Sequence, residues 1–83
     1  MTELQHILTM LEEIGSDKTV PKNIRLLIEQ AKRDLTNRSL EKTVKISSAI
    51  SFLDEAANDT NLPMYTRTQI MSAVSQLEAI NRS

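Results

Sequence analysis

The residues of this chain that could take part in chemistry are few and widely spaced. His6 is the one histidine, and no acid–base partner stands at a catalytic spacing from it. Two groups of acids recur 42 residues apart, namely Glu12, Glu13 and Asp17, and then Asp54, Glu55 and Asp59. Carboxylates are ligands for divalent cations, but the glycine-containing loop of a calcium site is missing from both groups. We therefore interpret these acids as solvating residues and expect no metal site.

Other catalytic and cofactor-binding patterns are also missing from the sequence. It has no cysteine and a single glycine, which excludes thiolate chemistry, disulfides and a glycine-rich phosphate loop. No nucleophile stands near a base at a recognisable spacing. We expect no catalytic residue and no cofactor, so the sequence predicts a protein that is not an enzyme.

Basic side chains gather in the middle of the chain, although the net charge is only −1. This basic segment consists of Lys32, Arg33, Arg38, Lys42 and Lys45. Nucleic-acid binding combines such charge with aromatic side chains that stack on bases, and none is interleaved here. We interpret the segment as a solvated face and expect no nucleic-acid partner. A nucleic-acid-associated protein that uses residues 32–45 is the first alternative.

A nine-residue stretch occurs twice, 42 residues apart. Its matching residues are Asp17, Pro21 and Arg25 in the first copy and Asp59, Pro63 and Arg67 in the second. An acid before a helix start accepts hydrogen bonds from unpaired backbone N–H groups, and an arginine one turn later can reach back to that carboxylate. A packing device is needed once per repeat and a catalytic site is not. We therefore interpret the six residues as structural turn staples.

Hydrophobic periodicity and capping residues predict four amphipathic helices. We expect them over about 3–14, from Pro21, from after a Ser39 cap to about 57, and from Pro63, with left-handed ends at Gly15 and Asn58. Such helices pair into two antiparallel hairpins, repeat one over about 3–36 and repeat two over about 39–81. The sequence therefore predicts an all-α, four-helix up-and-down bundle, a single domain over residues 1–83 built from two duplicated hairpins.

The last predicted helix carries a second apolar flank outside its core stripe. Met64 and Met71 stand seven residues apart, with Tyr65 nearby, where the first repeat has Lys22 and Glu29. Flexible thioethers suit an adaptable contact surface. We interpret Met64, Tyr65 and Met71 as a partner surface, so our leading hypothesis is a protein-interaction or structural adaptor module whose protein partner is unknown. The second alternative is a homodimer with no other partner.

The repeated stretch also carries two resemblances. Its Asp, Pro-x-x-x-Arg pattern between amphipathic helices resembles a HEAT-type helical repeat. From Leu11 to Leu77, the segments LEEIGSDKTVPKNIR and SAISFLDEAANDTNLPMYTRTQI resemble an uncharacterised family of small archaeal four-helix proteins with no assigned activity. That resemblance implies the fold and a cytoplasmic location, and it transfers no functional residues. The longest apolar run is Leu26-Leu27-Ile28, so we also expect no membrane span and no secretory signal.

Overall fold

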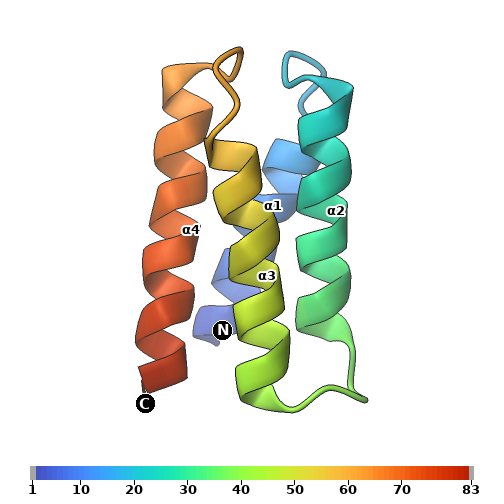
Figure 1. Cartoon of the computed structure of the whole chain (residues 1–83), viewed down its shortest axis with the longest axis vertical. Coiled ribbons are helices and arrows are strands. Elements are labelled where there is room, and N and C mark those ends of the chain that lie inside the picture. Colours follow the sequence, from blue (N-terminus) through green and yellow to red (C-terminus); the bar gives the residue numbers. More distant parts are fainter. Residues whose placement is uncertain (1, 83) are drawn as a thin grey trace.

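The computed structural model describes residues 2–82, which form four α-helices joined by short turns. The helices are α1 (Glu3–Ser16), α2 (Lys22–Thr36), α3 (Lys42–Ala57) and α4 (Met64–Arg82). Each helix packs antiparallel against the next, and α1 also packs against α4, which closes the bundle (Figure 1). The predicted all-α, four-helix up-and-down fold is confirmed. Common ancestry of its two hairpins stays a prediction.

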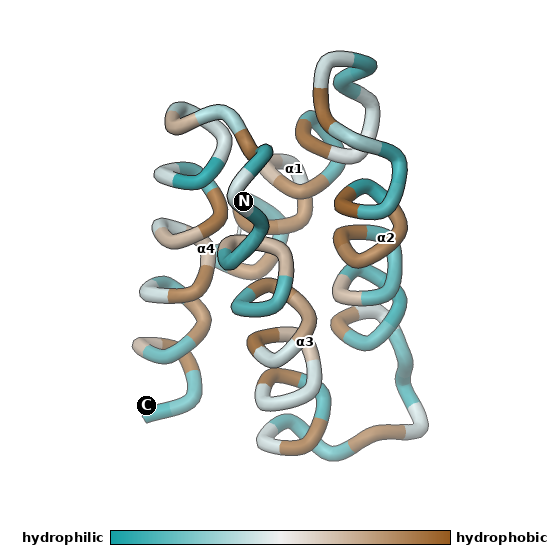
Figure 2. The backbone as a smooth tube through the Cα atoms, turned by 45° about the horizontal axis from the view of Figure 1, so that its top comes forward, coloured by the Kyte–Doolittle hydropathy of each residue, from teal (hydrophilic) through white to brown (hydrophobic). Residues whose placement is uncertain are grey.

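The core lies between the four helices and is aliphatic. Hydrophobic and hydrophilic segments alternate along every helix in Figure 2, as expected for helices that each bury one stripe. The largest side chains that are almost inaccessible to solvent are Ile7, Leu11, Ile24, Ile28, Leu35, Leu53, Ile70 and Leu77. The apolar spacing of the sequence also places Leu4, Leu8, Leu27, Ile50 and Ile80 on the inward stripes, but these five are half-buried at the edge of the core. Ala56, which that spacing does not place inside, is fully buried.

All three connecting turns have the same local geometry. Each begins with a residue whose side-chain oxygen accepts a hydrogen bond from the backbone N–H two residues later: Asp17 from Thr19 (2.9 Å), Asn37 from Ser39 (2.9 Å) and Asp59 from Asn61 (2.8 Å). A backbone hydrogen bond then closes each turn onto an apolar residue: Val20, Leu40 and Leu62. This is the turn that Asp and Asn side chains favour. This Asx turn therefore occurs in all three connections between helices, not only in the two that the repeated stretch contains.

Two expected left-handed helix ends are wrong. Gly15 lies inside α1, which continues to Ser16, and no glycine has a positive φ. An added Cβ at Gly15 would lie 2.9 Å from a carboxylate oxygen at the end of the Glu29 side chain, which is exposed and can move, so neither the backbone conformation nor the packing at this position requires glycine. Asn58 does follow the end of α3, but with φ −82° and ψ −5° it is right-handed. The Asx turn that begins at Asp59 supplies the change of direction instead.

The helix starts differ from expectation in three places, one of which is α4, which begins at Met64 and not at Pro63. Thr2 caps α1 with a capping box that includes Gln5, as expected. Pro21, expected as the first helical residue of α2, is its N-cap instead, with ψ 145°. The expected cap of α3 at Ser39 is wrong, because Ser39 lies within the turn and Glu41 precedes the helix without a side-chain hydrogen bond.

Candidate functional site

The second copy of the repeated stretch is held together by its arginine. The Arg67 Nε donates to the Ala57 carbonyl (2.9 Å) and an Arg67 Nη donates to the Asp59 carbonyl (2.7 Å). The expectation that Arg67 would bind the Asp59 carboxylate is therefore wrong. That carboxylate instead accepts from the Asn61 backbone and from the Asn23 side chain at 3.3 Å. The Asn23 contact joins the first turn of α2 to the α3–α4 turn, and both lie at the upper end of the bundle in Figure 1.

The first copy uses its arginine differently. Arg25 is half-buried, and its Nε is buried without a hydrogen-bond partner among the described residues. The Asp17 carboxylate is engaged by Thr19, whose hydroxyl donates at 2.6 Å and whose backbone N–H donates at 2.9 Å. The Thr19 side-chain hydrogen bond, followed by its backbone hydrogen bond, lowers the pKa of Asp17. The two copies therefore share their turn geometry but differ in what stabilises it.

The basic segment does not form a continuous cationic surface. Lys32 is half-buried, and its ammonium donates to Glu12 on α1 and to Glu29 on α2. Partial burial acts to lower the pKa of Lys32, but the hydrogen bonds to Glu12 and Glu29 outweigh this effect and raise the pKa. Lys32 therefore stabilises the contact between α1 and α2, and its charge is already compensated by two carboxylates.

The remaining bases surround the lower end of the bundle in Figure 1. Arg33 lines an open groove of about 290 Å³ with Lys32 on α2, Arg38 lies in the α2–α3 turn, and Lys42 and Lys45 lie in the first turn of α3. Both aromatic side chains lie elsewhere, since Tyr65 is at the upper end and Phe52 is half-buried against the core. The structure therefore brings no stacking surface to these bases.

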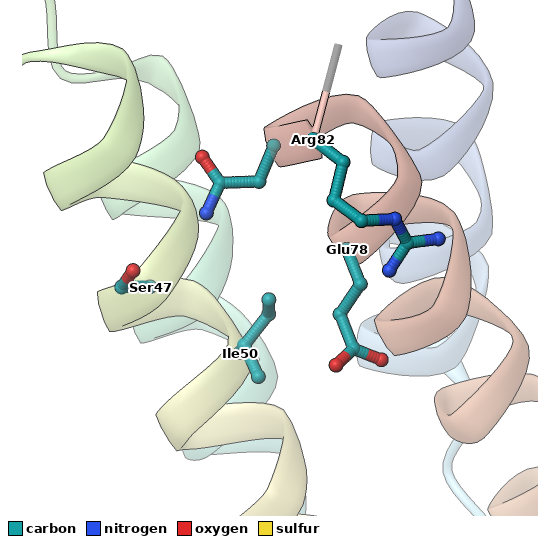
Figure 3. A pocket seen from close by; sticks show the side chains of 5 residues that line it. Ser47, Ile50, Glu78 and Arg82 are labelled. Atoms are coloured by element: carbon teal, nitrogen blue, oxygen red, sulfur yellow. The ribbon is translucent and has the colours of Figure 1, made fainter.

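A shallow cleft of about 340 Å³ lies between the start of α3 and the end of α4. Figure 3 shows Ile50 on α3 projecting towards Glu78 on α4, while the guanidinium of Arg82 extends away from Ile50. Asn81 also lines the cleft, and its Oδ1 is buried without a hydrogen-bond partner among the described residues. The cleft thus combines a carboxylate, a guanidinium, a hydroxyl and an amide with one aliphatic side chain, an arrangement in which none of these described residues is placed as a recognisable catalytic group.

The described part of the chain contains no group of three or more histidine, cysteine or acidic residues placed to hold a metal ion. His6 is exposed on α1. None of the helices described here is long and apolar enough to cross a membrane.

The exposed side of α4 is the most unusual surface of the bundle. We call it the α4 outer face and define it by six exposed residues: Met64, Tyr65, Thr68, Met71, Ser72 and Ser75. Met64 is 76% exposed, Tyr65 74% and Met71 45%. None of the six is charged, and the nearby Arg67 is held by backbone carbonyls.

The expected partner surface, Met64, Tyr65 and Met71, thus lies together on one helix face. Sequence reasoning missed the three small polar members of that face. The sequence does contain a sign of this face, because the ten residues from Thr68 to Leu77 include no charged side chain.

The equivalent side of α2 has the opposite character. We call it the α2 outer face; its residues, 42 positions earlier, are Lys22, Asn23, Leu26, Glu29, Gln30 and Arg33, and all six are exposed. Positions that are 42 residues apart on the two helices are therefore exposed alike. Three of the six side chains are charged on α2 and none is charged on α4.

Fold and surface together define a small all-α protein, a closed four-helix bundle with open surface grooves. The chain belongs to the uncharacterised protein family UPF0147, whose model matches residues 1–80. A UPF0147 protein of the archaeon Methanocaldococcus jannaschii is 47% identical over 77 residues, which are 93% of this chain and 83% of that protein. The resemblance to a family of small archaeal proteins is confirmed.

Two solved structures have the same fold. The crystal structure of a UPF0147 protein from Thermoplasma acidophilum matches with a TM-score of 0.89 and 33% identity, over 94% of this chain and 92% of that chain. A second crystal structure, of a protein described as being of unknown function, matches with a TM-score of 0.87 and 47% identity, over 92% of this chain and 86% of that chain.

Proposed function

We propose that this protein is a non-catalytic interaction module that binds another protein through the α4 outer face. The observation that carries the proposal is the exposure of Met64, Tyr65 and Met71 on a helix side without charge. Solvent-facing helix sides are ordinarily charged or polar, as five of the six residues of the α2 outer face are, the sixth being the exposed Leu26. Contiguous exposed apolar side chains mark interaction surfaces.

The chemistry of the face supports a protein partner. Thioether side chains adapt their shape to an apolar neighbour, and a tyrosine adds contact area with a polar end. The proposal includes a cytoplasmic location and excludes a nucleic-acid partner. The engagement of Lys32 by Glu12 and Glu29 supports that exclusion, because it removes one cation from the basic segment.

Affinity capture tests the proposal with a variant that gives α4 the charges of α2. The double variant Met64→Lys with Met71→Glu replaces two exposed side chains by the residues that α2 has 42 positions earlier. The matched control, Gln30→Glu, adds one charge to the exposed side of α2. Each protein is immobilised and exposed to an extract of its native cells, and the retained proteins are quantified.

Wild type and the control should retain the same partner, and the double variant should lose it. All three proteins should have the same thermal unfolding midpoint, because only exposed side chains change. Equal retention by all three proteins would contradict the proposed contact surface.

A further inference from the structure

We infer that the partner of the α4 outer face is a second copy of this chain, packed with its α4 antiparallel across a twofold axis between Met71 and Ser72. This inference rests on the proposed function and names its partner. It is carried by three properties of the α3–α4 side of the bundle: the absence of charge along α4 from Thr68 to Leu77, the opposite charge of its two ends, and its size.

The α4 outer face can meet itself without electrostatic cost. A twofold interface places the same surface on both sides, so any charged side chain near the axis would face its own copy. Like charges placed together across an interface cost several kcal/mol. The α2 outer face, with Lys22, Glu29 and Arg33, would bury charge in such a contact. The six residues of the α4 outer face carry none, and the nearest exposed charge on α4 is Glu78, which in this pairing lies opposite Tyr65 of the other copy, away from the axis.

The spacing of large and small residues along α4 matches an antiparallel pairing. With the axis between Met71 and Ser72, each methionine lies opposite a small residue of the other copy. Met71 meets Ser72, and Met64 meets Ala79, which is also exposed. Small residues opposite large ones let two helices interlock at the usual 8–10 Å between axes.

The two ends of the α3–α4 hairpin carry opposite charge. The upper end in Figure 1 has three acids, Asp54, Glu55 and Asp59, and one base, Arg67, which is bound to carbonyls. The lower end has three bases, Lys42, Lys45 and Arg82, and two acids, Glu41 and Glu78. An antiparallel pair places the acidic end of one copy beside the basic end of the other, whereas a parallel pair would place like ends together. Complementary ends thus favour the antiparallel arrangement.

The size of this side sets the strength of the contact. The molecule measures 32 × 23 × 21 Å. One long side therefore offers roughly 700 Å², just below the ~800 Å² per partner of a standard interface. Contact along α4 alone would be too small, so α3 must contribute its complementary ends. We expect a reversible dimer whose population depends on protein concentration.

Sedimentation of the purified full-length chain over a wide range of concentrations tests for the dimer. Wild type should change from monomer to dimer as the concentration rises. Met71→Glu, which places two carboxylates at the axis, should weaken the dimer by at least about 30-fold. The control Gln30→Glu should sediment as wild type does. A wild type that is monomeric throughout, or a dimer that Met71→Glu leaves intact, would overturn the inference.

Single cysteines test the arrangement, because the chain has no cysteine of its own. Met71→Cys lies at the axis and should crosslink to its copy with a short thiol-reactive linker. Met64→Cys should not, because an antiparallel pair separates the two copies of residue 64 by about 20 Å along the helix. Efficient crosslinking through Met64→Cys as well as Met71→Cys would show a parallel pair, in which both residues lie beside their own copies, and would overturn the inference.

A failure of the dimer inference can be distinguished from a failure of the proposed function by combining sedimentation with affinity capture. A monomeric wild type whose captured partner is lost in the Met64→Lys, Met71→Glu variant contradicts the second copy and leaves the interaction module standing. A monomeric wild type with capture unchanged in that variant contradicts both.

Discussion

The outer sides of α2 and α4 differ in charge although the fold treats them alike. The same positions face solvent on both helices, counted from Lys22 and from Met64. The α2 outer face carries three charged side chains, whereas the α4 outer face carries none. The fold therefore determines which positions of the two helices face solvent, but it does not determine which of these positions are charged. The comparison teaches that folding alone does not explain the uncharged α4 outer face, whereas the proposed partner would explain it.

A second difference lies at the inner edge of the same two helices. Lys32 on α2 is half-buried and bridges Glu12 and Glu29, while the residue 42 positions later, Val74, is buried. The α1–α2 side thus closes with an ion pair network and the α3–α4 side with an aliphatic contact. The two hairpins reach the same packing by different chemistry.

The largest expected effects test whether the two hairpins share one core. Ile28→Ala and Ile70→Ala each truncate a fully buried side chain at matching positions of α2 and α4. Each should lower the free energy of unfolding by about 2–5 kcal/mol through lost burial and the cavity that remains. Chemical denaturation measures both values. A loss below about 1 kcal/mol for either variant would show that the two helices are not packed alike.

The arginines of the repeated stretch should separate the two copies. Arg67→Ala removes two hydrogen bonds to carbonyls and should destabilise the protein by about 1–3 kcal/mol. Arg25→Ala removes a guanidinium whose Nε has no partner, and should cost less than about 1 kcal/mol. Denaturant unfolding of both variants gives the comparison. Equal losses would contradict the difference that the structure shows between the copies.

The Asx turn at Asp59 should depend on its side-chain oxygen. Asp59→Ala removes the acceptor for Asn61 and Asn23, and should lower stability by about 1–2 kcal/mol without altering any binding. Asp59→Asn is the matched control, because Asn37 already forms the same turn between α2 and α3. It should recover most of the loss. An unchanged denaturation midpoint in Asp59→Ala would contradict a structural role for the Asp59 side chain.

Replacing Lys32 by the residue that α4 carries should have a small effect. Lys32→Val removes the pairs with Glu12 and Glu29, which are partly exposed, and adds an aliphatic contact like that of Val74. Such pairs contribute about 0–1 kcal/mol, so stability should change by no more than that. Thermal melts at low and high salt check this, since the wild type should lose more stability in salt than the variant.

The smallest expected effect is on the pH dependence of stability, through the carboxylate of Asp17. The pKa of Asp17 is lowered from its ordinary value of 3.8, chiefly by the Thr19 hydroxyl and then by the Thr19 backbone N–H. The folded state therefore favours the charged carboxylate. The resulting stability is present above the unfolded pKa and is lost as pH falls through the folded pKa. Asp17→Asn should be slightly less stable than wild type near neutral pH, and the difference should shrink below about pH 4. A difference that is constant with pH would contradict the assignment.

Helix identity and most of the core could be predicted from the sequence because they depend on local periodicity. For example, the spacing of apolar residues in the sequence places Ile28 and Leu35 of α2, and Ile70 and Leu77 of α4, on the inward side of their helices, where all four are buried. Helix ends were less predictable, because several residue types can end a helix. Gly15 suggested a left-handed end, but it lies within the last turn of α1 and its φ is not positive.

Contacts between helices could not be predicted, because they depend on how each helix is rotated against its neighbours. The Lys32 bridge to Glu12 spans twenty residues, and the direction of Arg67 depends on the path of the turn it crosses. The uncharged face of α4 was recognised only through Met64, Tyr65 and Met71, since small polar residues such as Ser72 carry no signal until their neighbours are seen to be exposed together.

The most direct test of the α4 outer face follows methionine methyl groups by NMR in the presence of a soluble paramagnetic probe. Met64 and Met71 are exposed, and half-buried Met10 on α1 is an internal control. In dilute protein the probe should broaden the Met64 and Met71 signals and largely spare Met10. As the protein concentration rises, Met64 and Met71 should shift and become protected while Met10 stays unchanged. Signals of Met64 and Met71 that stay equally broadened at every concentration, and also after addition of native cell extract, would contradict the account.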